Sequence, residues 1–124
     1  MAEFKQWVHD EAFGKPPMIG KRLTQDEWIA YVETYRFGYV APDRVVLHHT
    51  WKPNEAQWAG IASMKSMQRF YAQKGWSSAP HVYAAPDGIW LFTPLNQVGI
   101  HAGTGNSGYR RGQLQWYSIG VEMV

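Results

Sequence analysis

The sequence predicts a mixed α/β (α+β) domain in which helices pack on a central mixed β-sheet of about four or more strands. Its 124 residues are about the length of one domain. Segments with helical spacing of apolar residues alternate with short β-branched runs, which is typical of helices packed on a sheet. The chain has no cysteine, which excludes disulfides, thiolate metal sites and a cysteine nucleophile.

Two helices are predicted before the first strand. Apolar residues near helical spacing predict a short helix over residues 3–13. A second helix should begin at a capping box, in which Thr24 and Glu27 bond each other's backbone N–H groups. We expect this helix to run to about Phe37, because Gly38 follows it.

The middle of the chain predicts a buried strand and a long helix. The apolar, β-branched run at residues 45–50 is typical of a central strand that is covered on both faces. A helix should then begin with Asn54 as N-cap and end at Lys74 and Gly75. Its predicted buried stripe is Trp58, Ile61, Met64, Met67, Phe70 and Tyr71.

The remainder predicts a β-hairpin and two further strands. The hairpin joins residues 81–85 to residues 89–93 through a Pro-Asp-Gly turn. A short strand over 98–101, a glycine-rich loop over 102–112 and a last strand over 117–124 follow. Because the chain stops inside an apolar strand, we expect a fragment, or a strand protected by a dimer or a swapped assembly.

Charge and composition indicate which classes of partner the chain can bind. The net charge is +2 and the cations are scattered, so no stripe for a nucleic acid backbone is visible. No apolar run reaches the ~20 residues of a membrane span, and the start is not typical of a signal peptide. Aromatic residues make up 15%, including seven Trp, and serve either in the core or on a sugar-stacking groove wall.

Strand histidines and one carboxylate are the candidate chemical groups. His48, His81 and His101 lie in or beside predicted strands, where imidazoles are either structural or converge on a metal or anion site. His48 and His49 must point to opposite faces of their strand. Glu122 lies mid-strand and is either exposed on the outer face or a buried carboxylate of raised pKa that acts as a base.

Five motifs in order resemble the zinc N-acetylmuramoyl-L-alanine amidases, the type 2 amidase and peptidoglycan recognition protein superfamily. The resemblance covers residues 45–124, as an amidase domain, and leaves residues 1–44 as an N-terminal helical extension. It implies a central mixed sheet, flanking helices and a groove for peptidoglycan. The motifs are Val-Val-Leu-His-His-Thr at 45–50, Gly-Trp-Ser-Ser-Ala-Pro-His-Val at 75–82, Asp-Gly-Ile-Trp at 87–90, Val-Gly-Ile-His-Ala-Gly at 98–103 with Asn106, and Ser-Ile-Gly-Val-Glu at 118–122.

The resemblance implies a role for each matching residue. His48 would be a Zn²⁺ ligand, His49 would face away, and Glu122 would be the catalytic base. Some phage members place a catalytic tyrosine before the hairpin histidine, but Pro80 occupies that position here. Thr50 and Trp76 are expected to contact substrate. His81, His101 and Asn106 would line the groove or the loop over it, and would either contact substrate or support the site from behind.

The sequence also departs from the family pattern. The two other zinc ligands come after the glutamate strand in the family, so only His48 of three ligands is identifiable here. We therefore expect a domain incomplete at its C-terminus and a chain that is inactive or weak as given. The alternative is a non-catalytic peptidoglycan-recognition module. Localisation is expected to be cytoplasmic synthesis with action on the cell wall, by phage lysis or non-classical export.

Overall fold

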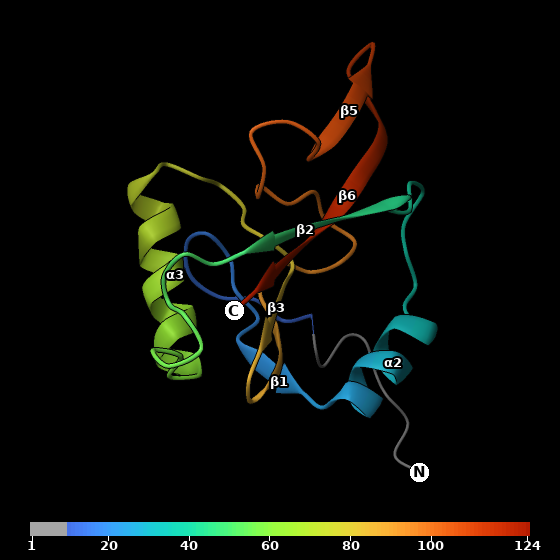
Figure 1. Cartoon of the computed structure of the whole chain (residues 1–124). Helices are drawn as coiled ribbons and strands as arrows, with labels where there is room; N and C mark the ends of the chain where they lie inside the picture. Colours follow the sequence, from blue (N-terminus) through green and yellow to red (C-terminus); the bar gives the residue numbers. More distant parts are fainter. Residues whose placement is uncertain (1–9) are drawn as a thin grey trace.

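The computed structural model describes residues 10–124, which form a mixed sheet with a helix on each side (Figure 1). This confirms the predicted mixed α+β class and its sheet of about four or more strands, because the described part has six. The elements are β1 Lys21–Leu23, α2 Gln25–Glu33, β2 Arg44–His49, α3 Ile61–Gln73, β3 Val82–Ala85, β4 Gly88–Leu91, β5 Ser107–Arg110 and β6 Gln113–Met123.

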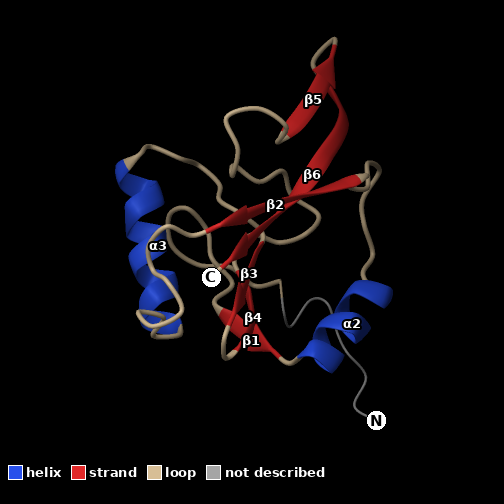
Figure 2. Cartoon of the chain, viewed as in Figure 1, coloured by secondary structure: helices blue, strands red, loops and turns tan. Residues whose placement is uncertain are grey.

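Strand β6 organises the sheet, whose order is β1-β4-β3-β6-β2 with β5 added to the first half of β6 (Figure 2). Strands β2 and β3 run parallel to β6 on its two sides, and β5 pairs with it antiparallel. In this register both His48 of β2 and Tyr83 of β3 lie beside Glu122 of β6. The sheet thus brings two distant motifs of the sequence together.

Each face of the sheet has its own apolar core. On the α3 side, the core includes Met18, Met64, Tyr71, Tyr83, Trp90 and Phe92. On the α2 side, it includes Leu23, Tyr31, Val82, Leu91, Tyr117 and Ile119. Neighbouring strand residues such as Tyr83 and Val82 therefore belong to opposite cores, as the alternation of side chains along a strand requires.

The first predicted helix falls mostly on residues 3–9, which lie outside the described residues. Residues 10–13 are not helical, and Phe13 instead forms an isolated bridge with Met18. Strand β1 pairs with β4, and Tyr31 of α2 is buried in the apolar core on the α2 side, the main core. The described part of residues 1–44 thus contributes a strand as well as a helix, and both belong to the fold of the domain.

The predicted capping box is confirmed at the start of α2. Thr24 Oγ1 accepts from the Glu27 N–H at 3.2 Å, and Glu27 Oε1 accepts from the Thr24 N–H at 2.9 Å. The helix ends at Glu33 and not at about Phe37. The chain leaves the helix there, and the Tyr35 hydroxyl bonds Asp10 and the Asn96 N–H.

The predicted start of the next helix is wrong by several residues. Asn54 and Gln57 bond each other's backbone as a capping pair would, but they close only a turn. Helix α3 begins at Ile61, after Gly60 has adopted a positive φ of 60°. Its predicted end is confirmed, with Lys74 as C-cap and Gly75 at φ 76°.

Strand β2 is an edge strand and not the central strand that its composition predicts. Val45 and Leu47 are 60% and 62% exposed. An apolar, β-branched run predicts a strand but does not determine its place in the sheet, and the longer β6 takes the central position.

The C-terminal strand is longer than predicted, and its neighbours differ. Residues 98–101 do not form a strand, whereas part of the predicted loop forms β5. Arg111 and Gly112, with φ of 51° and 75°, make the tight turn that joins β5 to β6. Because β6 has partners on both sides, it is not the unpaired strand that the predicted swapped assembly requires, and the dimer has no support here.

The helices of residues 10–124 were also compared with the requirements of a membrane span. None of them combines the length and the apolar character that a membrane crossing requires.

Candidate active site

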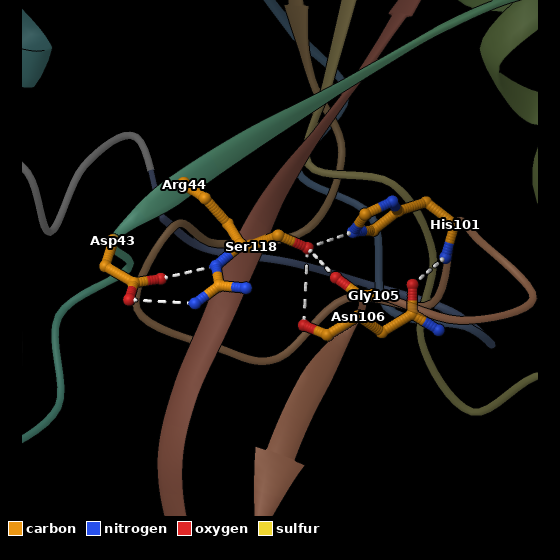
Figure 3. Close-up of polar contacts among 6 residues, drawn as sticks. All are labelled: Asp43, Arg44, His101, Gly105, Asn106 and Ser118. Atoms are coloured by element: carbon orange, nitrogen blue, oxygen red, sulfur yellow. Dashed lines mark hydrogen bonds and ion pairs between the residues drawn. The ribbon is translucent and has the colours of Figure 1, made fainter.

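One face of β6 carries the residues of the candidate site. Ser118, Gly120 and Glu122 alternate along β6, so they share the face that looks toward α3. The register adds His48 of β2, which lies opposite Glu122. His101, from the segment before β5, packs against this face (Figure 3).

Glu122 is half-buried on this face. Burial raises the pKa of its carboxyl above the usual value of 4.5, and the nearby His48 and His49 partly oppose that rise. The structure thus answers the question left open by the sequence, because Glu122 lies beside buried Tyr83 and is not on a fully exposed outer face. A carboxylate of raised pKa is a stronger proton acceptor than an exposed one.

His48 belongs to a chain of hydrogen bonds. Its Nε2 lies 3.1 Å from Nδ1 of His101, and Nε2 of His101 lies 3.1 Å from the Ser118 hydroxyl. The hydroxyl also lies 2.6 Å from the carbonyl oxygen of Gly105 (Figure 3). His101 is buried, and this burial, with smaller contributions from His81 and His48, lowers its pKa to about 4.

The network assigns the protons in this chain of hydrogen bonds. A carbonyl oxygen accepts only, so the Ser118 hydroxyl donates its proton to Gly105 and accepts from Nε2–H of His101. Nδ1 of neutral His101 is then an acceptor and receives Nε2–H of His48. Nδ1 is therefore the basic nitrogen of His48.

Asn106 and Gly120 hold His101 in place. The Asn106 side-chain oxygen accepts from the N–H groups of His101 and Ala102, and its amide donates to the Ala102 carbonyl. A Cβ on Gly120 would lie 2.3 Å from Cγ of His101, so only glycine leaves room for the ring. The Asn106 side chain thus braces the loop from within, which agrees with the supporting role among its two expected roles.

His81 also supports the site from behind. It is fully buried, its Nδ1 accepts from the Gly120 N–H at 3.0 Å, and its Nε2 donates to the Gln97 carbonyl at 2.7 Å. Burial lowers its pKa to about 4. Both ring nitrogens are bonded to backbone, so this geometry favours support over substrate contact, the two roles expected for His81.

Beside Glu122, an open pocket of about 460 Å³ contains two other predicted site residues, Thr50 and Trp76. Thr50 donates its hydroxyl to the Pro53 carbonyl, and Trp76 stacks on Tyr71 with ring centroids 5.1 Å apart. His49 is exposed at the end of β2 and lines this pocket as well, so it is not packed away behind the sheet.

The described donor side chains of the site do not form a complete metal centre by themselves. Within residues 10–124, no group of three or more His, Asp or Glu side chains comes together to hold a metal ion. His48 and His101 lie close to each other, but their facing nitrogens share a hydrogen bond. A three-ligand Zn²⁺ site therefore does not fit the described residues by themselves.

The sequence indicated no role for two of the residues that position His101, Ser118 and Gly120, beyond their place in a motif. Ser118 accepts a hydrogen bond from the His101 ring, and Gly120 leaves room for that ring. The available signal was the small size of two alternate residues on the same strand face as Glu122. Small residues there leave space on a sheet for another side chain.

The comparison with known families agrees with this arrangement. The profile of the N-acetylmuramoyl-L-alanine amidase family (Amidase_2) matches residues 38–124, which is more than half of the chain. The protein therefore belongs to the N-acetylmuramoyl-L-alanine amidase family. No curated protein and no solved structure gives a significant match.

Proposed function

We propose that this protein acts on peptidoglycan by hydrolysing the amide bond between N-acetylmuramic acid and the L-alanine of the stem peptide. The observation that carries this proposal is the half-buried Glu122, whose pKa is raised and which lies in register with His48 on one sheet face. Family membership supplies the class of bond. The proposed place of action is the cell wall, after synthesis in the cytoplasm.

In the proposed reaction, Glu122 is the general base. Its carboxylate takes a proton from a water molecule as the water oxygen bonds to the lactyl carbonyl carbon. Glu122 then returns that proton to the alanine nitrogen as the C–N bond breaks. The products are a carboxyl on the muramic acid and a free amine on the stem peptide, so atoms and charge balance.

His48 is proposed to assist this reaction through Nδ1. The hydrogen bond to His101, which is itself bonded to Ser118, holds the His48 ring and leaves Nδ1 as its basic atom. The family is typically zinc-dependent, and His48 is the matching ligand position. Because residues 10–124 do not complete a zinc site, we expect weak hydrolysis at most from this chain.

The test is release of stem peptide from purified muropeptide by the 124-residue chain, measured by chromatography with and without added Zn²⁺. Release that is lost in Glu122→Gln supports the proposal. Release that persists in this variant would contradict the role of Glu122.

The second candidate function is recognition of peptidoglycan without cleavage. The observation that favours it is the incomplete donor set for a metal within the described residues. Binding of muropeptide by the unaltered chain, with no release of stem peptide even at saturating Zn²⁺, would favour this recognition function over the amidase.

A further inference from the structure

The pocket beside Glu122 has a cationic and aromatic wall that the proposed reaction does not use. Lys74 caps the end of α3, and its ammonium lies 4.4 Å from the centre of the Trp76 ring and 5.1 Å from that of Phe70. Phe70 is 48% exposed, although the helical spacing predicted that it would be buried. The cation is thus held over two aromatic rings at the pocket wall.

The charges in this pocket are not balanced. Lys52 and Lys74 are its two cationic side chains, and Glu122 is its acidic one. Neither lysine forms an ion pair with a carboxylate among residues 10–124. Most exposed lysines are simply solvated, but these two share one pocket with the candidate base and with an apolar wall.

The two halves of a muropeptide differ in charge. The sugar half is neutral, because its lactyl carboxyl is tied up in the amide. The stem peptide carries free carboxylates on its acidic residue and at its end. Two ammonium groups without a carboxylate partner among the described residues, on the wall of the pocket that Glu122 also lines, therefore complement the peptide half and not the sugar half.

We propose that Lys74, assisted by Lys52, binds the free carboxylate of the acidic residue of the stem peptide while the peptide chain packs on Trp76 and Phe70. The inference rests on the proposed function and specifies which part of the substrate occupies this pocket. It agrees with the proposed proton transfer, because the nitrogen that Glu122 protonates belongs to the stem peptide. The same contact makes the site sensitive to amidation of the stem peptide.

The experiment compares two ligands that differ in one group: muramyl tripeptides with D-glutamate or D-isoglutamine as the second residue. Binding is measured by NMR titration in the Glu122→Gln background, where hydrolysis does not consume the ligand. We expect the carboxylate ligand to bind about two- to five-fold more tightly, as an exposed charge pair allows. Raising the salt concentration should reduce this preference.

Two matched variants then locate the contact. Lys74→Met removes the charge but keeps an unbranched side chain over Trp76, so it should abolish most of the preference, and Lys52→Met should remove a smaller part. Lys65→Met is the control, because Lys65 is exposed on the same helix but does not line this pocket. It should leave the preference unchanged, and circular dichroism should show all three variants folded.

The outcomes separate this inference from the proposed function. Equal affinity for the two ligands, a preference that survives Lys74→Met, or no binding of either ligand would overturn the inference. Stem-peptide release by the unaltered chain would still support the amidase in those cases. Conversely, a carboxylate preference lost in Lys74→Met together with no hydrolysis, even at saturating Zn²⁺, would keep the inference and favour recognition over the amidase.

Discussion

The two faces of β6 differ in their side chains: one is apolar and buried, and the other carries small and polar residues. Toward α2, the strand presents Tyr117 and Ile119, which are buried in the main apolar core. Toward α3, it presents Ser118, Gly120 and Glu122, which leave room for His101 and carry polar atoms. One strand thus stabilises the domain with one set of alternate residues and positions the site with the other.

The difference shows where stability and chemistry separate in this protein. The core face depends on volume and shape, so it tolerates changes that preserve both. The site face depends on a few hydrogen bonds and on the absence of a Cβ at Gly120, so it should be sensitive to the addition or loss of single atoms. Substitutions on neighbouring residues of β6 can therefore separate loss of activity from loss of stability.

The largest effect should come from Glu122→Gln. The amide cannot accept the proton that the carboxylate takes, so any hydrolysis should fall by about 10²-fold or more. The unfolding midpoint in urea should change little, because Glu122 is only half-buried. Activity is measured as stem-peptide release, and an equal loss in Val121→Ala, on the opposite face, would show that the strand rather than the carboxylate matters.

Next in size is a loss of stability in acid caused by His81. Its folded pKa of about 4 lies below the ordinary 6.5, so the unfolded chain takes up the proton first as the pH falls. Its contribution is complete above pH 6.5 and is lost between pH 6.5 and pH 4, by about 3 kcal/mol. Urea unfolding at several pH values measures this loss.

His81→Gln provides the control for that measurement. It should reduce the steepness of the pH dependence but not remove it, because buried His101 also has a pKa of about 4 and contributes with the same sign. An unchanged pH dependence in His81→Gln would mean that His81 does not carry the effect.

A smaller effect should follow from adding one methyl group to the site face. In Gly120→Ala, the new Cβ would meet the His101 ring, and we expect a loss of about 2 kcal/mol in the free energy of unfolding. Ile119→Val, which removes one methyl group from the core face, should cost about 1 kcal/mol. Chemical denaturation compares them, and a smaller cost for Gly120→Ala would contradict the proposed difference between the faces.

Ser118→Ala should cost less stability than Gly120→Ala, at about 1 kcal/mol. Its main consequence should be a change in protonation, because His101 loses the acceptor for its Nε2–H. Nitrogen NMR of the histidine rings should show Nε2–H on His48 in the unaltered chain and a mixture of tautomers in the variant. Ser118→Thr keeps a hydroxyl and should restore the single tautomer, unless its added methyl group displaces His101.

Local features of the fold were predictable from the sequence because they depend on neighbouring residues. The capping box at Thr24, the end of α3 at Gly75 and the turn between β3 and β4 each depend on a few adjacent residues. Strand β5 was missed because glycine-rich composition predicts a loop, and its strand character comes from pairing with β6.

The candidate site could be predicted only in part. The motif resemblance selected His48 and Glu122, but the alternation of side chains did not predict that His49 lines the pocket beside Glu122. That His48 and Glu122 lie side by side depends on the parallel register of β2 and β6, which no local pattern contains. The backbone partners of His81 and the pocket wall at Lys74 depend on the same long-range packing.

The sequence by itself thus determined the class of fold, the family resemblance and the residue types that chemistry can use. The tertiary structure alone decided that β2 lies at the edge, that Ser118 sets the proton on His101, and that Lys74 and Glu122 line the same pocket. The physical reason is distance along the chain. Capping and side-chain alternation act over a few residues, whereas the register of β6 joins residues more than seventy positions apart.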